Sequence, residues 1–186
     1  ISMSVNAQDS KSVPVKNFDN ITVSSGIDLY LTKGSSERLT IKGIDDMIKN
    51  VVIEQQGSKV IIKYKSGTKW SSMFKNQSIK VYVDYKTLTH LSASGGSDVF
   101  TQNTLTSDIL TLSASGGSDL KLSLVCKNLS LTVSGGSDAS LTGSAENFKL
   151  IASGGSDVHA FSFPVNYAHA TVNGGSDANI NVNKVL

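Results

Sequence analysis

The sequence predicts an all-β protein: a right-handed, parallel β-helix-like solenoid with coils of about 20 residues, preceded by a more antiparallel N-terminal β part. Two observations carry this prediction. The motif Ser-Gly-Gly-Ser-Asp, or a close variant of it, recurs five times between residues 91 and 177. Apolar residues between the copies alternate with polar residues at a period of two, which is typical of strands and excludes helices there.

The five copies are evenly spaced along the chain. Their Asp residues lie 21, 19, 19 and 20 positions apart, at Asp98, Asp119, Asp138, Asp157 and Asp177. A β-sandwich of regular hairpins is the alternative fold, but hairpins reverse the direction of every second copy. Identical motifs at a nearly constant spacing therefore favour coils that stack in parallel, and crossovers between parallel strands are right-handed.

Each copy has the same inward face. Counted from Asp138, the apolar residues lie seven and five positions before it, at Leu131 and Val133, and one and three positions after it, at Ala139 and Leu141. Side chains at alternate positions of a strand share a face, so we expect these positions to point inward. The same alternation, extended through the motif, places the first Gly and the second Ser inward and the Asp outward. Paired glycines indicate a corner where backbones approach closely.

The first half of the chain repeats less clearly. Residues 21–31 carry the same frame and form a divergent sixth copy that lacks one glycine. Residues 44–50 predict one helical turn. Alternating runs predict strands of an antiparallel sheet that begins and caps the solenoid, whose open end exposes strand edges, at residues 39–42, 51–55, 60–64 and 79–83. The predicted organisation is one continuous structural domain with a polar lead-in (1–12), an N-terminal β part (13–90) and the repeats (91–186).

Composition and charge exclude several classes of protein. Residues 1–90 hold 13 Lys and Arg against 8 Asp and Glu, whereas residues 91–186 hold 4 against 7. An acidic repeat half and a single arginine, Arg38, argue against a nucleic-acid partner. The sequence has no run of eighteen apolar residues, so no transmembrane segment is expected.

The five repeat Asp residues are the first candidate site. Parallel coils lie about 4.8 Å apart, so aligned carboxylates repel each other and need solvent, hydrogen-bond donors or cations. The favoured interpretation is structural: each Asp accepts hydrogen bonds from backbone N–H groups or neighbouring Ser hydroxyls. The alternative is a row of metal sites for calcium, although one motif per coil supplies few oxygens for each ion. No other cofactor is expected.

The second candidate site is the loop at residues 65–75. It contains Trp70 and Phe74 among lysines that include Lys69. A basic loop with aromatic side chains can stack on sugars or nucleobases, which makes these three residues a candidate ligand-binding set. The alternative is that the aromatic side chains pack against the end of the sheet.

Residues for catalysis are not apparent. The sequence has no HExxH, GxSxG or P-loop motif and no pair of cysteines. The single cysteine, Cys126, lies in an apolar stretch and is expected to be buried and structural. His159 and His169 are both expected on the outward parity, and a metal site between them across adjacent coils is the less favoured interpretation. The sequence therefore predicts that the protein is not an enzyme.

The chain resembles the head GIN domain of putative autotransporter adhesins, a bacterial family of unknown function. The resemblance lies in the opening at residues 18–34, in Ile79 to Val83 leading into the first repeat, and in the serial Ser-Gly-(Gly/Ala)-(Ser/Gly)-Asp motif. In many members the centre of the motif reads Ala-Gly, where this chain has Gly-Ser. The resemblance implies a β-helix-like fold and an extracytoplasmic location in a Gram-negative bacterium: periplasmic, outer-membrane-anchored or secreted. It implies no catalytic residues.

The expected function is a non-enzymatic extracytoplasmic β-solenoid module: an adhesin, or a surface binding or structural protein, with a polysaccharide or a cell-surface protein as its partner. Two alternatives stay open, a polysaccharide-acting β-helix lyase or hydrolase and a passive structural spacer of the cell envelope. The sequence Val5-Asn6-Ala7 is either the end of a leader that could direct envelope anchoring or a polar lead-in.

Overall fold

A computed structural model describes residues 9–67 and 78–184 of the chain. The described part is nearly all β, with one helical turn, α1 (Asp45–Ile48). In chain order its strands are β1 (Asp9–Val13), β2 (Asn20–Ser24), β3 (Ile27–Lys33), β4 (Arg38–Gly43), β5 (Val51–Gln56), β6 (Lys59–Tyr64), β7 (Ile79–Tyr85), β8 (His90–Ser94), β9 (Val99–Thr101), β10 (Leu105–Ser115), β11 (Leu120–Ser134), β12 (Ala139–Ser153), β13 (Asp157–Val172) and β14 (Asp177–Val182).

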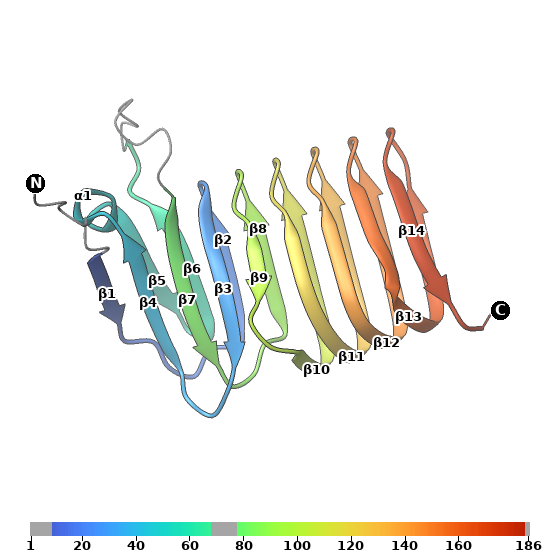
Figure 1. Cartoon of the computed structure of the whole chain (residues 1–186), viewed down its shortest axis with the longest axis horizontal. Helices are drawn as coiled ribbons and strands as arrows, with labels where there is room; N and C mark the ends of the chain where they lie inside the picture. Colours follow the sequence, from blue (N-terminus) through green and yellow to red (C-terminus); the bar gives the residue numbers. More distant parts are fainter. Residues whose placement is uncertain (1–8, 68–77, 185–186) are drawn as a thin grey trace, which may run out of the picture.

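The strands form a flattened solenoid with two layers (Figure 1). The front layer holds β4, β7, β3, β9, the first halves of β11 to β13, and β14. The back layer holds β5, β6, β2, β8 and the second halves of β10 to β13. The chain descends in the front layer and ascends in the back layer as it advances toward its C-terminus, which is the right-handed sense. Strands of successive coils pair in parallel, so the predicted solenoid is confirmed.

The core lies between the two layers and is built from the predicted alternating positions. In β11, Leu120, Leu122 and Leu124 point inward from the front layer. Lys127 and Asn128 are then both exposed, so the alternation shifts by one position at the lower bend. The shift turns the following odd-numbered positions inward from the back layer, at Leu129, Leu131 and Val133. Every coil thus buries apolar side chains from both of its strands.

Each upper corner of the five regular copies is a turn of two glycines in the left-handed region. In the first corner Gly95 has a φ of 63° and Gly96 a φ of 76°. The second Ser of the motif, Ser97, is fully buried as predicted. The prediction that the first Gly points inward is wrong, because Gly95 is exposed. Two successive left-handed residues reverse the chain, so the alternation of the strand does not continue through the corner.

The divergent copy at residues 21–31 is the first coil of the stack. β2 pairs in parallel with β8, opposing Ser24 to Ser94, and β3 pairs in parallel with β9, opposing Leu29 to Val99. In its corner Ser25 takes the first position with a φ of 73°. The sixth copy therefore stacks directly on the first of the five regular copies, although most of the N-terminal half lies between them in the sequence.

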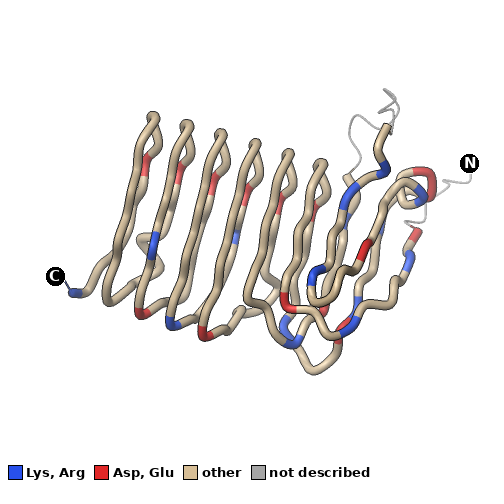
Figure 2. The backbone as a smooth tube through the Cα atoms, turned by 180° about the vertical axis from the view of Figure 1, so that it is seen from behind, with Lys and Arg blue, Asp and Glu red and all other residues tan. Residues whose placement is uncertain are grey.

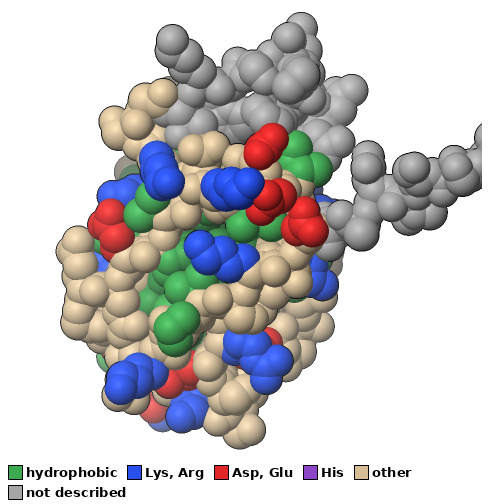
Figure 3. Space-filling view, turned by 90° about the vertical axis from the view of Figure 1, so that its left-hand side faces the viewer, with side chains coloured by type: hydrophobic (Ala, Val, Ile, Leu, Met, Phe, Trp, Pro, Cys, Tyr) green, Lys and Arg blue, Asp and Glu red, His purple; other side chains and the backbone are tan. Residues whose placement is uncertain are grey.

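The strands between these copies extend the solenoid toward its N-terminal end. β4 pairs antiparallel with β1 and β7, and β5 pairs antiparallel with β6, as the sequence predicts for the cap. β6 and β7 also continue the parallel stack beside β2 and β3. Seen along the axis, this end shows apolar side chains with lysine and arginine around them (Figure 3). A groove of about 350 Å³ opens here between β1 and β5, over Ile41 and Ile53.

Candidate functional site

The repeat Asp residues form a row along the front layer, just after the corners. The residues that follow each Asp pair in register, Leu120 with Val99 and Ala139, and Leu29 with Val99. Asp119 therefore lies beside the Asp of each neighbouring coil, and Asp28 of the first coil extends the row by one position. Figure 2 shows these residues at the same height in successive coils. Two of the carboxylates accept hydrogen bonds across the coils: Asp98 Oδ1 from the N–H of Asp119 at 3.3 Å, and Asp138 Oδ1 from the N–H of Asp157 at 3.1 Å. These bonds are of the kind expected for structural turn Asp residues.

A second row, of serine hydroxyls, lies buried beneath the Asp row. Ser97 donates its backbone N–H to Ser118 Oγ at 3.0 Å, and Ser118 donates its own to Ser137 Oγ at 3.0 Å. In the first coil Ile27 replaces this serine, and its N–H binds Ser97 Oγ at 3.2 Å. A buried N–H that lacks a partner costs about 1–3 kcal/mol, so the hydroxyls satisfy donors that the corners leave unpaired. The motif therefore specifies how coils join.

The electrostatics of the Asp row are those of crowded carboxylates. Partial burial raises the pKa of Asp98; the N–H donated by Asp119 lowers it, while the charges of Asp119 and Asp28 raise it further. Lys121 Nζ lies 3.9 Å from a carboxylate oxygen of Asp119. Within residues 9–67 and 78–184, no three His, Cys, Asp or Glu side chains are grouped so that they could hold a metal ion. Calcium binding by the row stays a prediction.

The aromatic loop set, Lys69, Trp70 and Phe74, lies outside the described residues, and its role stays a prediction. Cys126 is buried, and burial raises the pKa of its thiol to about 11, so the thiol is neutral at pH 7. His159 lies on the front layer and His169 on the back layer, because the lower bend of β13 falls between them.

Stacked rings form an aromatic row on the front layer. Tyr30 stacks on Tyr82 at 4.9 Å and on Phe100 at 5.0 Å between ring centroids. The two outer faces of the stack are also covered, by Lys42 Nζ at 4.6 Å from the Tyr82 centroid and by Lys121 Nζ at 5.5 Å from that of Phe100. Since cation–π contacts occupy the ring faces that a sugar would stack on, the row is a stabilising ladder rather than a binding platform.

The back layer carries a groove that crosses four coils. It is lined by three consecutive residues from each of β10, β11, β12 and β13, and its volume is about 340 Å³. We call it the four-coil groove. Its lining residues are Ile109, Leu110, Thr111, Asn128, Leu129, Ser130, Asn147, Phe148, Lys149, Tyr167, Ala168 and His169.

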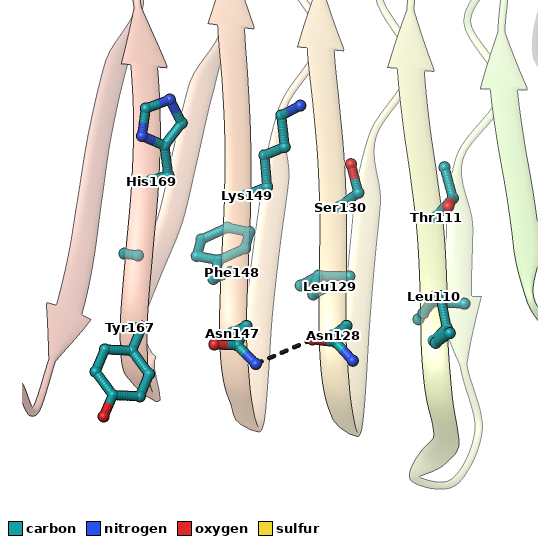
Figure 4. Close-up of a pocket in the computed structure, with 12 residues that line it drawn as sticks. Leu110, Thr111, Asn128, Leu129, Ser130, Asn147, Phe148, Lys149, Tyr167 and His169 are labelled. Atoms are coloured by element: carbon teal, nitrogen blue, oxygen red, sulfur yellow. Dashed lines mark hydrogen bonds between the residues drawn. The ribbon is translucent and has the colours of Figure 1, made fainter.

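The groove has two walls and a floor. Residues in register form the lower wall (Ile109, Asn128, Asn147 and Tyr167) and the upper wall (Thr111, Ser130, Lys149 and His169). The floor between them is the strand backbone, where Leu110, Leu129 and Phe148 turn their side chains into the core. Outward residues two positions apart in a strand are roughly 7 Å apart, which sets the width of the groove. Figure 4 shows these two rows across neighbouring strands.

Most polar side chains of the four-coil groove make no hydrogen bond or ion pair with the rest of the described chain. Asn147 Nδ2 donates to Asn128 Oδ1 at 2.9 Å, and among the described residues Asn147 Oδ1 and Asn128 Nδ2 are left without a hydrogen-bond partner. In the described part of the chain, the side chains of Thr111, Ser130, Lys149 and His169 make no hydrogen bond or ion pair. Lys184 Nζ lies 5.6 Å from the Tyr167 centroid, at the end of the lower wall. The arrangement suits a ligand rich in hydroxyl groups.

The sequence prediction did not include this groove. A signal for it exists: Ile109, Asn128, Asn147 and Tyr167 are separated by 19, 19 and 20 residues, the same spacing as the motif. These residues share a row only because the alternation shifts at each lower bend. If the outward positions of the copies are aligned by their distance from the lower bend, these four residues fall at the same position.

The fold and the groove together define a β-solenoid protein with a regular outer face that carries a groove across four coils. The family model for the "putative auto-transporter adhesin, head GIN domain" matches residues 17–186, so the chain belongs to this family, as the resemblance predicted. No protein with curated annotation matches the chain. No helix in the described ranges is long and apolar enough to cross a membrane.

Solved structures of putative adhesins share the fold. One from Bacteroides fragilis has 23% sequence identity and a TM-score of 0.88, and the match covers 95% of this chain and 81% of the other. One from Parabacteroides merdae has 19% identity and a TM-score of 0.72, with 95% and 82% covered. One from Parabacteroides distasonis has 18% identity and a TM-score of 0.71, with 95% and 82% covered. At these identities the likeness concerns the fold.

Proposed function

We propose that the protein is a non-enzymatic, extracytoplasmic module that binds a surface ligand, in the manner of an adhesin, at the four-coil groove. The observation that carries this proposal is the polar side chains of the groove that make no hydrogen bond or ion pair in the described part of the chain; they come from four successive coils whose strands pair in register. The adhesin family supports a surface role and a location outside the cytoplasm. A polysaccharide or a cell-surface protein is the expected partner.

The composition of the groove favours binding over catalysis. Glycoside hydrolysis normally uses two carboxyl groups on either side of the scissile bond. The lining of the four-coil groove contains Lys149 and His169 but no Asp or Glu. The carboxylates of the Asp row lie on the opposite layer, and two of them, those of Asp98 and Asp138, accept hydrogen bonds from backbone N–H groups. A polysaccharide-acting enzyme therefore has less support than a binding module, and a passive spacer leaves the unused polar side chains unexplained.

A glycan array and a panel of cell-surface proteins test the proposal with a matched pair of variants. Ser130→Trp places a large side chain in the middle of the groove. Ser140→Trp places it at a comparable half-buried outward position of the front layer. We expect the wild type and Ser140→Trp to bind the same ligands and Ser130→Trp to lose them. Equal binding by Ser130→Trp, or no binding by the wild type, would overturn the proposal.

A reducing-sugar assay on every glycan that binds tests the absence of catalysis. We expect no release of new reducing ends by the wild type over a prolonged incubation. Release that depends on the protein would show that the chain is an enzyme, and the comparison with Ser130→Trp would show whether the groove is its active site.

A further inference from the structure

The four-coil groove has the dimensions and charge of a site for one class of ligand. We propose that it binds a linear acidic glycan, laid along the solenoid axis, whose carboxylate or sulfate groups are held by Lys149. This inference rests on the proposed function and names its ligand class.

The direction of the groove suits an extended glycan. It crosses four strands, and neighbouring strands lie about 4.8 Å apart, so it spans roughly 14 Å along the axis. Each pyranose residue of an extended chain lengthens the chain by a distance similar to the spacing between neighbouring strands. Successive sugars therefore meet equivalent positions on successive coils. The spacing of the walls, roughly 7 Å, admits one row of sugar rings.

The floor of the groove argues against a peptide strand as the ligand. A peptide that extends a sheet needs unpaired backbone N–H and C=O groups at a strand edge. The floor belongs to interior strands, since β11 pairs with β10 and β12, and β12 with β11 and β13. Recognition at this site falls to side chains: amides and hydroxyls that both donate and accept, as sugar hydroxyls do.

The ends of the lower wall add apolar contacts. Tyr167 lies at one end, and Ile109, which is 62% exposed, lies at the other. Between them the Asn128–Asn147 pair keeps one amide donor and one amide acceptor that have no partner among the described residues. A polar centre with apolar ends suits pyranose rings, which carry hydroxyl edges and C–H faces.

The charge of the groove selects for anions. Lys149 is the one formally charged residue in its lining, and His169 lies beside it in register. Lys184 adds a second ammonium group near Tyr167. The nearby acids are directed elsewhere: Asp108 pairs with Lys127 at 3.1 Å, and Glu146 lines a separate groove beyond the bend. An acidic sugar residue therefore meets a cation and no facing carboxylate.

Calorimetric titration of the full chain with hexagalacturonate tests the inference, and the methyl ester of the same hexasaccharide is the neutral probe. A chondroitin sulfate hexasaccharide tests sulfate as the source of the charge. We expect at least one acidic probe to bind and the neutral ester to bind at least about tenfold more weakly, because charge-assisted hydrogen bonds are roughly twice as strong as neutral ones.

Two lysine variants test which ammonium group binds the acidic glycan. Lys149→Gln removes the ammonium group from the groove, and Lys121→Gln removes one from the front layer, where Lys121 neighbours Asp119. We expect Lys149→Gln to weaken the acidic probe about tenfold and to leave the neutral probe unchanged, while Lys121→Gln changes neither. An unchanged urea midpoint for Lys149→Gln would show that the variant is folded.

The outcomes separate this inference from the proposed function. Acidic binding that is weakened by Lys149→Gln and abolished by Ser130→Trp supports both. Equal affinity for the acidic and neutral probes, or acidic binding that Lys149→Gln leaves intact, overturns the acidic glycan. If no acidic probe binds while the panel still yields a ligand that Ser130→Trp abolishes, the ligand class is wrong and the binding module stands. If the panel also yields nothing, both fail.

Discussion

Replacing the two glycines of one corner by alanine, one at a time, separates the two reasons for glycine in the repeat. Gly154 and Gly155 have φ values of 72° and 74°, so alanine at either position adopts the same unfavourable left-handed conformation. Only the first position also faces a neighbour. A Cβ on Gly154 would lie 3.0 Å from the backbone N of Gly135 in the preceding coil, whereas a Cβ on Gly155 meets nothing within 4 Å.

The expected magnitudes follow from these two terms. The left-handed conformation costs alanine about 1–2 kcal/mol, and the lower entropy of the unfolded chain returns roughly 0.4–1 kcal/mol. Gly155→Ala should therefore destabilise the protein by about 1 kcal/mol. Gly154→Ala adds an overpacked contact against a backbone that cannot rotate away, which costs a further 1–3 kcal/mol or so. The expected difference between the two variants is thus about 1–3 kcal/mol.

Urea unfolding measures this difference, with the midpoint and the slope m fitted for both variants and the wild type. We expect m to stay constant and the midpoint of Gly154→Ala to be the lower of the two. Equal destabilisation would refute the argument that coil stacking requires glycine at the first position. The first coil already provides a natural comparison: Ser25 occupies this position there, at the end of the row of corners.

Three further predictions concern single side chains. Tyr85 is fully buried, its hydroxyl has no hydrogen-bond partner among the described residues, and burial raises the pKa of that hydroxyl. Because Tyr85→Phe removes this unpaired polar group, it should raise the free energy of unfolding by about 1 kcal/mol. A lower urea midpoint would contradict this. The pKa of Asp98 is higher in the folded than in the unfolded state, so the folded state binds more protons between the two values and stability falls as the pH rises through that window. Compared with Asp98→Asn, the wild type should gain stability as the pH falls from 7 toward 4 in urea titrations, and parallel curves would refute the shift. Cys126, whose pKa is raised to about 11 by burial, should react with iodoacetamide only after unfolding, and rapid labelling of the native protein at pH 7 would contradict this.

Much of the fold could be predicted because it depends on local pattern. Alternation is a property of each strand, so Leu131, Val133, Ala139 and Leu141 could be placed inward without knowledge of their partners. The regular spacing of the motif predicted parallel coils in register. The same reasoning failed at Gly95, because a turn of two left-handed residues breaks the alternation that the prediction carried through it.

The candidate site was less predictable than the fold. Thr111, Ser130, Lys149 and His169 differ in chemistry and share no motif, so the sequence does not indicate that they form one wall. The sequence indicated the repeat Asp residues as a candidate site because they recur at a regular spacing. The carboxylates of Asp98 and Asp138 and the hydroxyl of Ser97 accept hydrogen bonds from backbone N–H groups of neighbouring coils, which is a reason for repetition that involves no ligand.

The sequence by itself determined the period, the strand faces and the parallel stack, since each follows from composition and spacing along the chain. The tertiary structure decided which distant segments meet. It placed Tyr30 between Tyr82 and Phe100, and it put residues 21–31 beside residues 91–101. The physical reason is that a lateral neighbour in a solenoid is set by strand pairing and by the bend of each coil. Both depend on packing between coils, and no single stretch of sequence carries that information.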